Sequence, residues 1–433
     1  MLERLLEILR TSDADDFEVT DSVTTGSEFY FIRHRLDQDR AKKVEHVSVR
    51  VYKKIEDGAF LGIASGEINP TATDEEMEKA VSDLSYQASL AKNMPYSLRE
   101  PKEAEELEIA VPSEKENAKR LIKAFASVEE TDTEDLNSYE LFSNVTTKRF
   151  ITSKGIDITE TYPSSMLEYV VNARNDEHEI ELYRLDRLGS CDEEIIRRNV
   201  EDVLRYGKDR LLAVPTPKLG ECAVLFSTDA ALEIYRFLLY GLNVAYIFRK
   251  MSPMEIGKPI KEEVLGDKIT LSAKRTLPNS DRNFRYDEEG APVRDLVLLR
   301  DNVPENFWGG RMFAEYMGLD DTFSVTNWAV EPGTKTEEEL RSGRYLEIVE
   351  FSDFQVDEIT GDIFGEIRLA YYHDGEKTTV VSGGSVSGDL KECLSEIYLS
   401  DTLKQYNNAL IPAVTRLEKV TVTGIEDEEK GLE

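Results

Sequence analysis

The chain has 433 residues, of which 40% are hydrophobic and 9% aromatic, the composition of a globular protein long enough for two domains. Its formal charge is −33, because 86 acidic residues spread along the chain outnumber 53 basic ones. A field of this sign repels phosphate backbones, so direct binding to nucleic acid is disfavoured. The simplest interpretation of the charge is a role in solubility or an adaptation to salt or habitat.

The three cysteines, Cys191, Cys222 and Cys393, lie far apart and form no C-x-x-C pair, which is typical of a reduced cytosolic compartment. The opening MLERLLEILR lacks the apolar core of a signal peptide, and no apolar run approaches the length of a membrane span. We therefore expect a soluble cytoplasmic protein with no membrane association.

The first half of the chain contains amphipathic helical patterns and alternating strand patterns. The helical patterns cover residues 1–10, 69–92, 113–130 and 191–213, with Thr73 or Asp74 as the N-cap of the second and Ser113 at the start of the third. Strand patterns cover residues 17–23, 28–36, 44–55 and 58–68, with more strands near 136–190 and turns at Asp57-Gly58 and Lys154-Gly155. The charged segment 93–108, which contains two prolines, predicts a surface connector.

The best candidate linker is VPTPK, residues 214–218. After it we expect a strand at 221–227, an apolar helix near 228–249, many strands and loops, a short helix near 388–397, a final strand at 417–424 and an acidic tail ending at Glu433. Helices and antiparallel strands are segregated, which predicts an α+β fold. We expect an N-terminal domain over 1–213 and a largely antiparallel β domain with one buried helix over 214–433.

No local motif predicts a metal or nucleophile site. The histidines His34, His46, His178 and His373 share no spacing that would place two on one helix face, and neither H-E-x-x-H nor a Cys/His cluster occurs. There is no G-x-S-x-G elbow, and no cysteine has a histidine nearby in sequence. Each histidine is interpreted as an ordinary surface or strand residue.

Two loops carry residues that could bind a ligand. The segment GGSVSGD, residues 383–389, predicts a turn from a strand into a helix, where backbone N–H groups could bind an anion, although a structural turn is the favoured interpretation. The segment YDEEG, residues 286–290, groups three carboxylates that could bind a cation or act as acid and base. In so acidic a chain, a solvated loop is the default expectation for it.

The apolar helix near 228–249 is apolar on nearly all sides. Leu232, Tyr235, Leu239, Leu242 and Tyr246 form one stripe, and further apolar side chains occupy the other faces. A helix of this kind is buried, so we expect it to belong to the core.

Several segments resemble the TldD/PmbA family, once described as modulators of DNA gyrase. The resemblance follows the chain in the same order through residues 47–64, 153–161, 284–295 (FRYDEEGAPVRD), 357–376 and 380–397. One arm of this family carries H-E-x-x-x-H on a helix, with a later cysteine, and its members are thought to be zinc peptidases. The other arm, PmbA or TldE, lacks these ligands and pairs with the first.

The resemblance places Tyr235, Arg236 and Tyr240 at the positions of the H-E-x-x-x-H motif. Phenol and guanidinium groups supply neither the imidazole ligands nor the carboxylate base that a zinc peptidase needs at neutral pH. The segment 402–414, where the catalytic arm has its cysteine, contains none, and Cys393 lies earlier in a predicted helix. We therefore expect a vacated catalytic helix, no metal and no cofactor in this chain, with zinc only in a TldD-like partner.

The resemblance implies a non-catalytic subunit of a cytosolic metalloprotease that acts on unfolded peptides, paired with an H-E-x-x-x-H subunit. Candidate peptide-cavity or loop residues are Asp287, Glu288, Glu289, Gly290, Gly384 and Ser385. A stand-alone homodimeric scaffold that binds peptides or proteins is the alternative. A third hypothesis is an enzyme that uses the acidic loop with one of the dispersed histidines, so whether the chain is itself an enzyme stays open.

Overall fold

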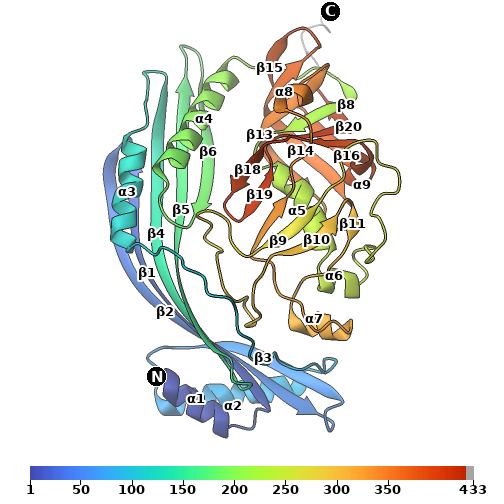
Figure 1. Ribbon diagram of the computed structural model, residues 1–433. Helices are drawn as coiled ribbons and strands as arrows, with labels where there is room; N and C mark the ends of the chain where they lie inside the picture. Colours follow the sequence, from blue (N-terminus) through green and yellow to red (C-terminus); the bar gives the residue numbers. More distant parts are fainter. Residues whose placement is uncertain (426–433) are drawn as a thin grey trace, which may run out of the picture.

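Six long strands form the first sheet of the computed structural model, which describes residues 1–425, so the predicted acidic tail ending at Glu433 lies outside the described residues. The strands are β1 (Asp16–Ile32), β2 (Arg35–Ile55), β3 (Phe60–Ile68), β4 (Glu134–Thr152), β5 (Asp157–Arg174) and β6 (Glu179–Leu188), all antiparallel in the order β3-β2-β1-β4-β5-β6. Figure 1 shows them curving along one side of the molecule.

Some strand predictions are corrected by this sheet. The predicted strand 28–36 crosses a hairpin turn, because Arg33 and His34 both adopt positive φ angles between β1 and β2. The predicted strands 17–23 and 44–55 are parts of much longer ones. The predicted turns at Asp57-Gly58 and Lys154-Gly155 are confirmed, with Gly58 at φ +87° and Gly155 at +93°, a region that glycine enters without steric cost.

Four helices cover the first sheet, namely α1 (Leu2–Thr11), α2 (Asp74–Leu90), α3 (Glu114–Ala126) and α4 (Glu193–Leu211). One apolar cluster joins α1 and α2 to β1, β2 and β3, and another joins α3 and α4 to β4, β5 and β6. Thr73 caps α2 through a capping box and Ser113 caps α3, as predicted. The four helical patterns of the first half are confirmed.

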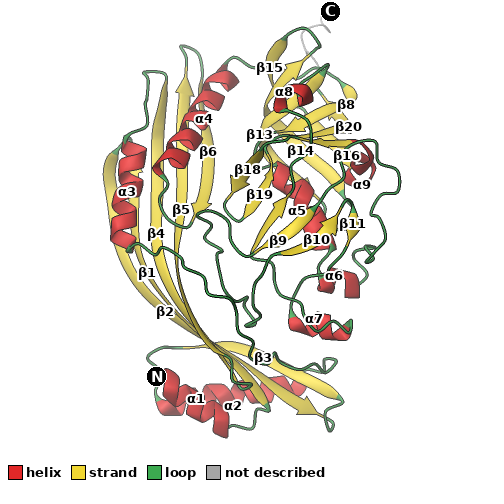
Figure 2. Cartoon of the chain, in the orientation of Figure 1, coloured by secondary structure: helices red, strands yellow, loops and turns green. Residues whose placement is uncertain are grey.

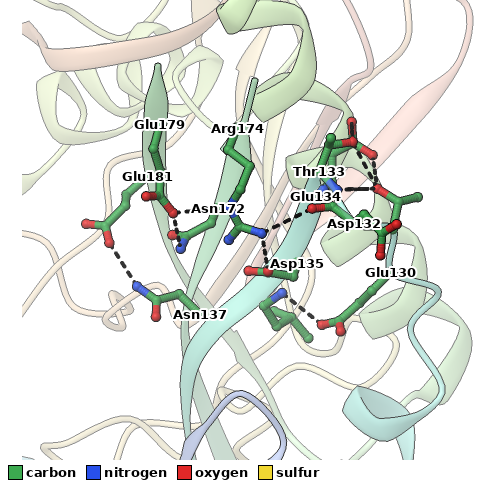
Figure 3. A network of polar contacts seen from close by, with 12 residues as sticks. Glu130, Asp132, Thr133, Glu134, Asp135, Asn137, Asn172, Arg174, Glu179 and Glu181 are labelled. Carbon is green, nitrogen blue, oxygen red and sulfur yellow. Dashed lines mark hydrogen bonds and ion pairs between the residues drawn. The ribbon is translucent and has the colours of Figure 1, made fainter. Parts of the chain in front are cut away.

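A polar network fixes the ends of β4, β5 and β6 (Figure 3). Arg174 on β5 donates to Asp135 on β4 at 2.7 Å and to Glu179 on β6 at 3.3 Å. Asn137 on β4 donates to Glu181 on β6 at 2.8 Å. Partly exposed pairs contribute only about 0–1 kcal/mol each, so the network specifies strand register more than it stabilises the fold.

The remaining strands form two further sheets. The smaller has the order β11-β10-β9-β12-β19-β18, and the larger has the order β13-β8-β20-β16-β14-β15-β7, with β17 paired to β20. The smaller sheet consists of β9 (Leu271–Lys274), β10 (Leu296–Arg300), β11 (Val303–Pro304), β12 (Asn327–Val330), β18 (Leu403–Tyr406) and β19 (Ala409–Pro412). The larger consists of β7 (Val214–Pro215), β8 (Gly220–Phe226), β13 (Tyr345–Val356), β14 (Asp362–His373), β15 (Thr378–Ser382), β16 (Ser385–Asp389), β17 (Ile397–Leu399) and β20 (Thr415–Thr423).

The helices of the second half are short, apart from the first of them. They are α5 (Ala231–Gly241), α6 (Val244–Phe248), α7 (Arg311–Tyr316), α8 (Glu337–Leu340), α9 (Leu390–Cys393) and a 3-10 turn at Leu394–Glu396. The largest apolar cluster of the protein draws on α5 and on strands of both sheets. The architecture is α+β with mostly antiparallel sheets, as expected. No helix within residues 1–425 is long and apolar enough to cross a membrane.

The predicted linker 214–218 begins with a strand. β7, Val214–Pro215, pairs in parallel with β15 of the larger sheet, so this segment is anchored by backbone hydrogen bonds. The first sheet uses strands that precede α4, and the other two sheets use strands that follow it. The proposed division into domains at 213 and 214 stays a prediction.

The predicted connector 93–108 runs as a loop between the first sheet and the second half of the chain (Figure 2). The Ser97 N–H donates to the Glu315 carboxylate at 3.1 Å, and the Ala104 N–H donates to the Tyr286 hydroxyl at 3.0 Å. Lys102 pairs with Asp321 at 3.2 Å. The connector therefore links the two halves through polar contacts.

Candidate functional site

The helix at the predicted catalytic position is shorter than its sequence suggests. The pattern 228–249 predicts one helix, but the structure divides it into α5 and α6 at Leu242 and Asn243. Asn243 has an extended backbone, and its side chain caps α6 by accepting from the Ala245 N–H at 2.8 Å. An asparagine that caps a new helix start explains the interruption.

Tyr235 lies entirely within the core. Its side chain is 0% exposed, and its hydroxyl is 2.6 Å from Oγ1 of Thr415, which is also fully buried on β20. Burial raises the pKa of Tyr235 well above its ordinary value, so the phenol stays protonated at neutral pH. The prediction that this helix belongs to the core is confirmed for its central residues.

Arg236 points away from the core into a cavity of about 300 Å³. It pairs with Glu233, one turn earlier on α5. The same cavity is lined by Arg184 of β6 and Glu350 of β13, which form an ion pair between the first sheet and the second half of the chain. The position at which the resemblance places the glutamate of H-E-x-x-x-H is therefore occupied by an ion-paired arginine.

Tyr240 is half-buried among other aromatic rings. Its ring centroid lies 6.3 Å from that of Tyr246 and 6.5 Å from that of Trp308. The Trp308 indole N–H donates to the Leu239 carbonyl at 2.7 Å, which fixes the indole against α5. Tyr240 therefore packs against other aromatic rings.

The residues at these positions do not fit a zinc ion. The Tyr235 phenol is enclosed and protonated, and the Arg236 guanidinium would repel a cation. Cys393 is buried and its Sγ is 3.4 Å from the Lys419 carbonyl, where burial raises the pKa of the thiol to about 11. Within residues 1–425 the structure brings together no group of three or more His, Cys, Asp or Glu that could hold a metal.

The histidines lie apart from α5. His34 contacts Tyr139 and Glu130, His46 lies 3.7 Å from Glu67 and His373 lies 3.1 Å from Thr378. His34, His46 and His178 are exposed, and His373 is half-buried on β14.

The acidic loop differs from the expected solvated loop. Asp287 is only 5% exposed, and its carboxylate accepts three backbone N–H groups, from Glu289 at 2.9 Å, Ala291 at 2.8 Å and Ser324 at 2.7 Å. Burial raises the pKa of Asp287, and the N–H donors of Ser324 and Ala291 partly offset that rise. Asp287 therefore organises the loop internally.

The other acids of this loop point elsewhere. Glu288 is exposed, as expected, whereas Glu289 accepts from the Arg311 N–H at 2.6 Å and from Arg99 of the connector at 3.3 Å. Gly290 has φ +79°, and a side chain there would meet Ile156. The structure thus separates the three predicted carboxylates into different environments, and a role for them in a peptide cavity stays a prediction.

The glycine-rich segment 383–389 is not the predicted strand-to-helix turn. Gly383 and Gly384, with φ angles of +81° and +80°, form a kink at which the Gly383 N–H donates to the Ile367 carbonyl of β14 at 2.9 Å and the Gly384 carbonyl accepts from the Ile367 N–H at 3.0 Å. Ser385 opens strand β16, and the following helix has four residues and is capped by Asp389. The Gly383 N–H is therefore used within the sheet, and strand β16 separates the two glycines from the start of α9.

A cleft between the two halves of the chain contains charged residues that the sequence analysis did not single out. It has a volume of about 420 Å³. We call it the charged cleft and define it by Asp186 of β6, Arg198 and Asp202 of α4, Asp229 at the start of α5, and Lys404 and Tyr406 of β18. These residues are separated by up to 220 positions in sequence, so no local motif indicates them.

The charged cleft continues towards the helix of the predicted catalytic position. Arg184, Thr228 and Asp229 line both this cleft and the cavity that contains Arg236. Figure 1 shows α4 on the side of the first sheet that faces the second half of the chain. The cleft is therefore a junction between α4, β6, the start of α5 and β18.

Comparison with known proteins agrees with this architecture. Residues 219–424 match the family model described as the PmbA/TldA metallopeptidase C-terminal domain. An uncharacterised protein of Methanocaldococcus jannaschii is 23% identical over 287 residues, which are 61% of this chain and 64% of that protein. The chain thus spans slightly less than two thirds of that relative's length.

Solved structures resemble nearly the whole chain. TldE from Thermococcus kodakarensis has a TM-score of 0.80 at 17% identity, and the match covers 98% of this chain and 100% of the TldE chain. A proposed modulator of DNA gyrase from Thermotoga maritima has a TM-score of 0.78 at 17% identity, covering 98% and 99%. A second, from Bacteroides thetaiotaomicron, has a TM-score of 0.77 at 14% identity, covering 98% of both chains. At these identities the likeness concerns the fold.

The second half of the chain is thus a domain of the metallopeptidase-related kind, preceded by helices on a long antiparallel sheet. Residues 219–424 therefore belong to the PmbA/TldD family and nearly the whole chain shares the fold of TldE, in agreement with the resemblance of the co-linear segments.

Proposed function

We propose that this chain is the metal-free, non-catalytic subunit of a cytoplasmic TldD/PmbA-type zinc metalloprotease that acts on unfolded peptides. The observation that carries the proposal is the state of α5, where Tyr235 is enclosed in the core and Arg236 is an ion-paired cation. A hydrolytic zinc site needs imidazole or thiolate ligands with an open coordination position, and these side chains offer neither.

The catalytic metal would then be supplied by a partner chain that carries H-E-x-x-x-H. The match of residues 219–424 to a metallopeptidase-related domain and the likeness in fold to TldE support this assignment. This chain would contribute part of the wall that holds the peptide. The alternative hypothesis from the sequence is a homodimeric scaffold without a protease partner. It predicts that no H-E-x-x-x-H chain associates with this protein.

A peptidase assay with an unstructured fluorogenic peptide tests the proposal. We expect no cleavage by this chain alone and little by the H-E-x-x-x-H homologue of the same genome, but cleavage when the two are mixed. A zinc chelator is expected to abolish the activity of the mixture. The proposal would be contradicted if this chain alone cleaved the peptide and kept that activity through further purification. It would also be contradicted if the homologue's activity were the same with and without this chain.

A further inference from the structure

The charged cleft has the size of a ligand site. Its volume of about 420 Å³ falls in the range of roughly 300–1,000 Å³ that small-molecule sites occupy. Tyr169, Tyr206 and Tyr406 give it partly apolar walls. It lies between two halves of a chain, a common place for such sites.

Two cations and two anions of this cleft lack an ion-pair partner. Within residues 1–425, neither Arg198 nor Lys404 has a carboxylate within 4.0 Å, and neither Asp186 nor Asp229 has a basic group within that distance. Neighbouring charges behave differently, because Arg184 pairs with Glu350 and Arg205 with Asp202. The cleft therefore holds two cations and two anions without an ion pair, next to charges that are paired.

Two of these groups are substantially shielded from water. Lys404 is half-buried, its ammonium lies 5.2 Å from the centroid of the Tyr406 ring, and burial lowers its pKa. Asp186 is half-buried and accepts from Asn199 at 3.0 Å and from Tyr169 at 3.3 Å, and burial raises its pKa. Holding unpaired charges in such a place destabilises the free protein, which points to a ligand that pairs them.

We propose that the charged cleft binds a short peptide with both termini free, whose carboxylate pairs with Lys404 and Arg198 and whose ammonium pairs with Asp186 and Asp229. A simple anion or cation would leave one pair of charges unsatisfied, whereas a zwitterion matches both. Choosing a peptide over other zwitterions rests on the proposed function, since short peptides are what a protease acting on unfolded chains releases.

Calorimetric titration of the full chain, without any partner, tests this proposal. The probes are di-, tri- and tetra-alanine, with free alanine, N-acetyl-tri-alanine and tri-alanine amide as comparisons. At least one free peptide is expected to bind at a single site, and blocking either terminus is expected to weaken binding about tenfold or more, because each block removes a charge-assisted pair. No binding of any alanine peptide, equal binding of blocked forms or equal binding of free alanine would overturn the proposal.

Amino-acid substitutions in the cleft test which residues bind each terminus of the peptide. Lys404→Gln is expected to reduce the preference for tri-alanine over its amide severalfold, and Asp229→Asn to reduce the preference for tri-alanine over its N-acetyl form severalfold. Arg198→Gln is expected to weaken the free peptide severalfold. Its matched control is Arg197→Gln, the preceding residue on α4, which pairs with Glu201 outside the cleft and should leave binding unchanged.

Equal losses in Arg197→Gln and Arg198→Gln would overturn the assignment. Both positions are exposed, so folding of these two variants is not at risk even if Lys404→Gln fails to fold. Because the titration uses this chain alone, its failure is distinct from failure of the proposed pairing with a catalytic subunit.

Discussion

Replacing Tyr235 by alanine is expected to destabilise the second half of the chain by about 3–5 kcal/mol, as in other deletions of large buried rings. The ring is 0% exposed and sits in the largest apolar cluster, between strands of two sheets. Tyr235→Phe keeps the ring and loses one hydrogen bond to Thr415, which costs about 1 kcal/mol. Urea unfolding followed by tyrosine and tryptophan fluorescence measures both changes.

A second experiment asks whether a histidine at position 235 could bind zinc. Tyr235→His, even combined with Arg236→Glu and Tyr240→His, should bind no zinc tightly, because the first imidazole would lie in an enclosed core site next to Thr415. A matched control is Arg236→Glu alone, a half-buried position where the change should be mild in stability. Stoichiometric zinc in the triple variant, or a Tyr235→Ala protein as stable as the wild type, would refute this account of α5.

Replacing Asp287 by alanine is expected to cost about 3–5 kcal/mol of stability, because three buried or partly buried backbone N–H groups lose their acceptor at once. Asp287→Asn should lose less, since an amide oxygen can replace one carboxylate oxygen but its NH₂ group cannot accept from Ser324. The thermal unfolding midpoint of each variant is the measurement.

The adjacent acid provides the control for this prediction. Glu288 is exposed, so Glu288→Ala is expected to change stability by no more than about 0.5 kcal/mol. If the loop were a catalytic acid pair, Asp287→Asn would remove an activity of this chain without loss of stability. Equal stabilities of Asp287→Ala and Glu288→Ala would show that the three hydrogen bonds do not matter.

Local signals in the sequence predict the helices of the first half well. Thr73 and Ser113 mark helix starts because their hydroxyl groups accept N–H groups within three residues, a distance that local patterns can report. The length of the first strands was missed, because the hairpin turn at Arg33 and His34 uses positive φ angles without glycine or asparagine. The asparagine that divides α5 from α6 was hidden within an apolar run.

The candidate site was predicted in part. The local apolar pattern predicts that Tyr235 lies in the core. It does not predict the burial of Asp287, because that carboxylate accepts from Ser324, which lies 37 positions further along the chain. Gly383 and Gly384 do turn the chain, but the strand β16 that follows them depends on sheet topology and not on a local signal. The charged cleft is assembled from β6, α4, the start of α5 and β18, and tertiary packing alone brings these together.

We propose above that this chain works as the metal-free partner of a zinc subunit. The most direct test is to co-express it with the H-E-x-x-x-H homologue of its own genome, purify through a tag on this chain alone, and determine the mass and zinc content of the product. We expect a one-to-one complex with about one zinc, and we expect the zinc to be lost when the homologue's histidines are replaced. A homodimer of this chain that excludes the homologue, or zinc that stays with this chain alone, would contradict it.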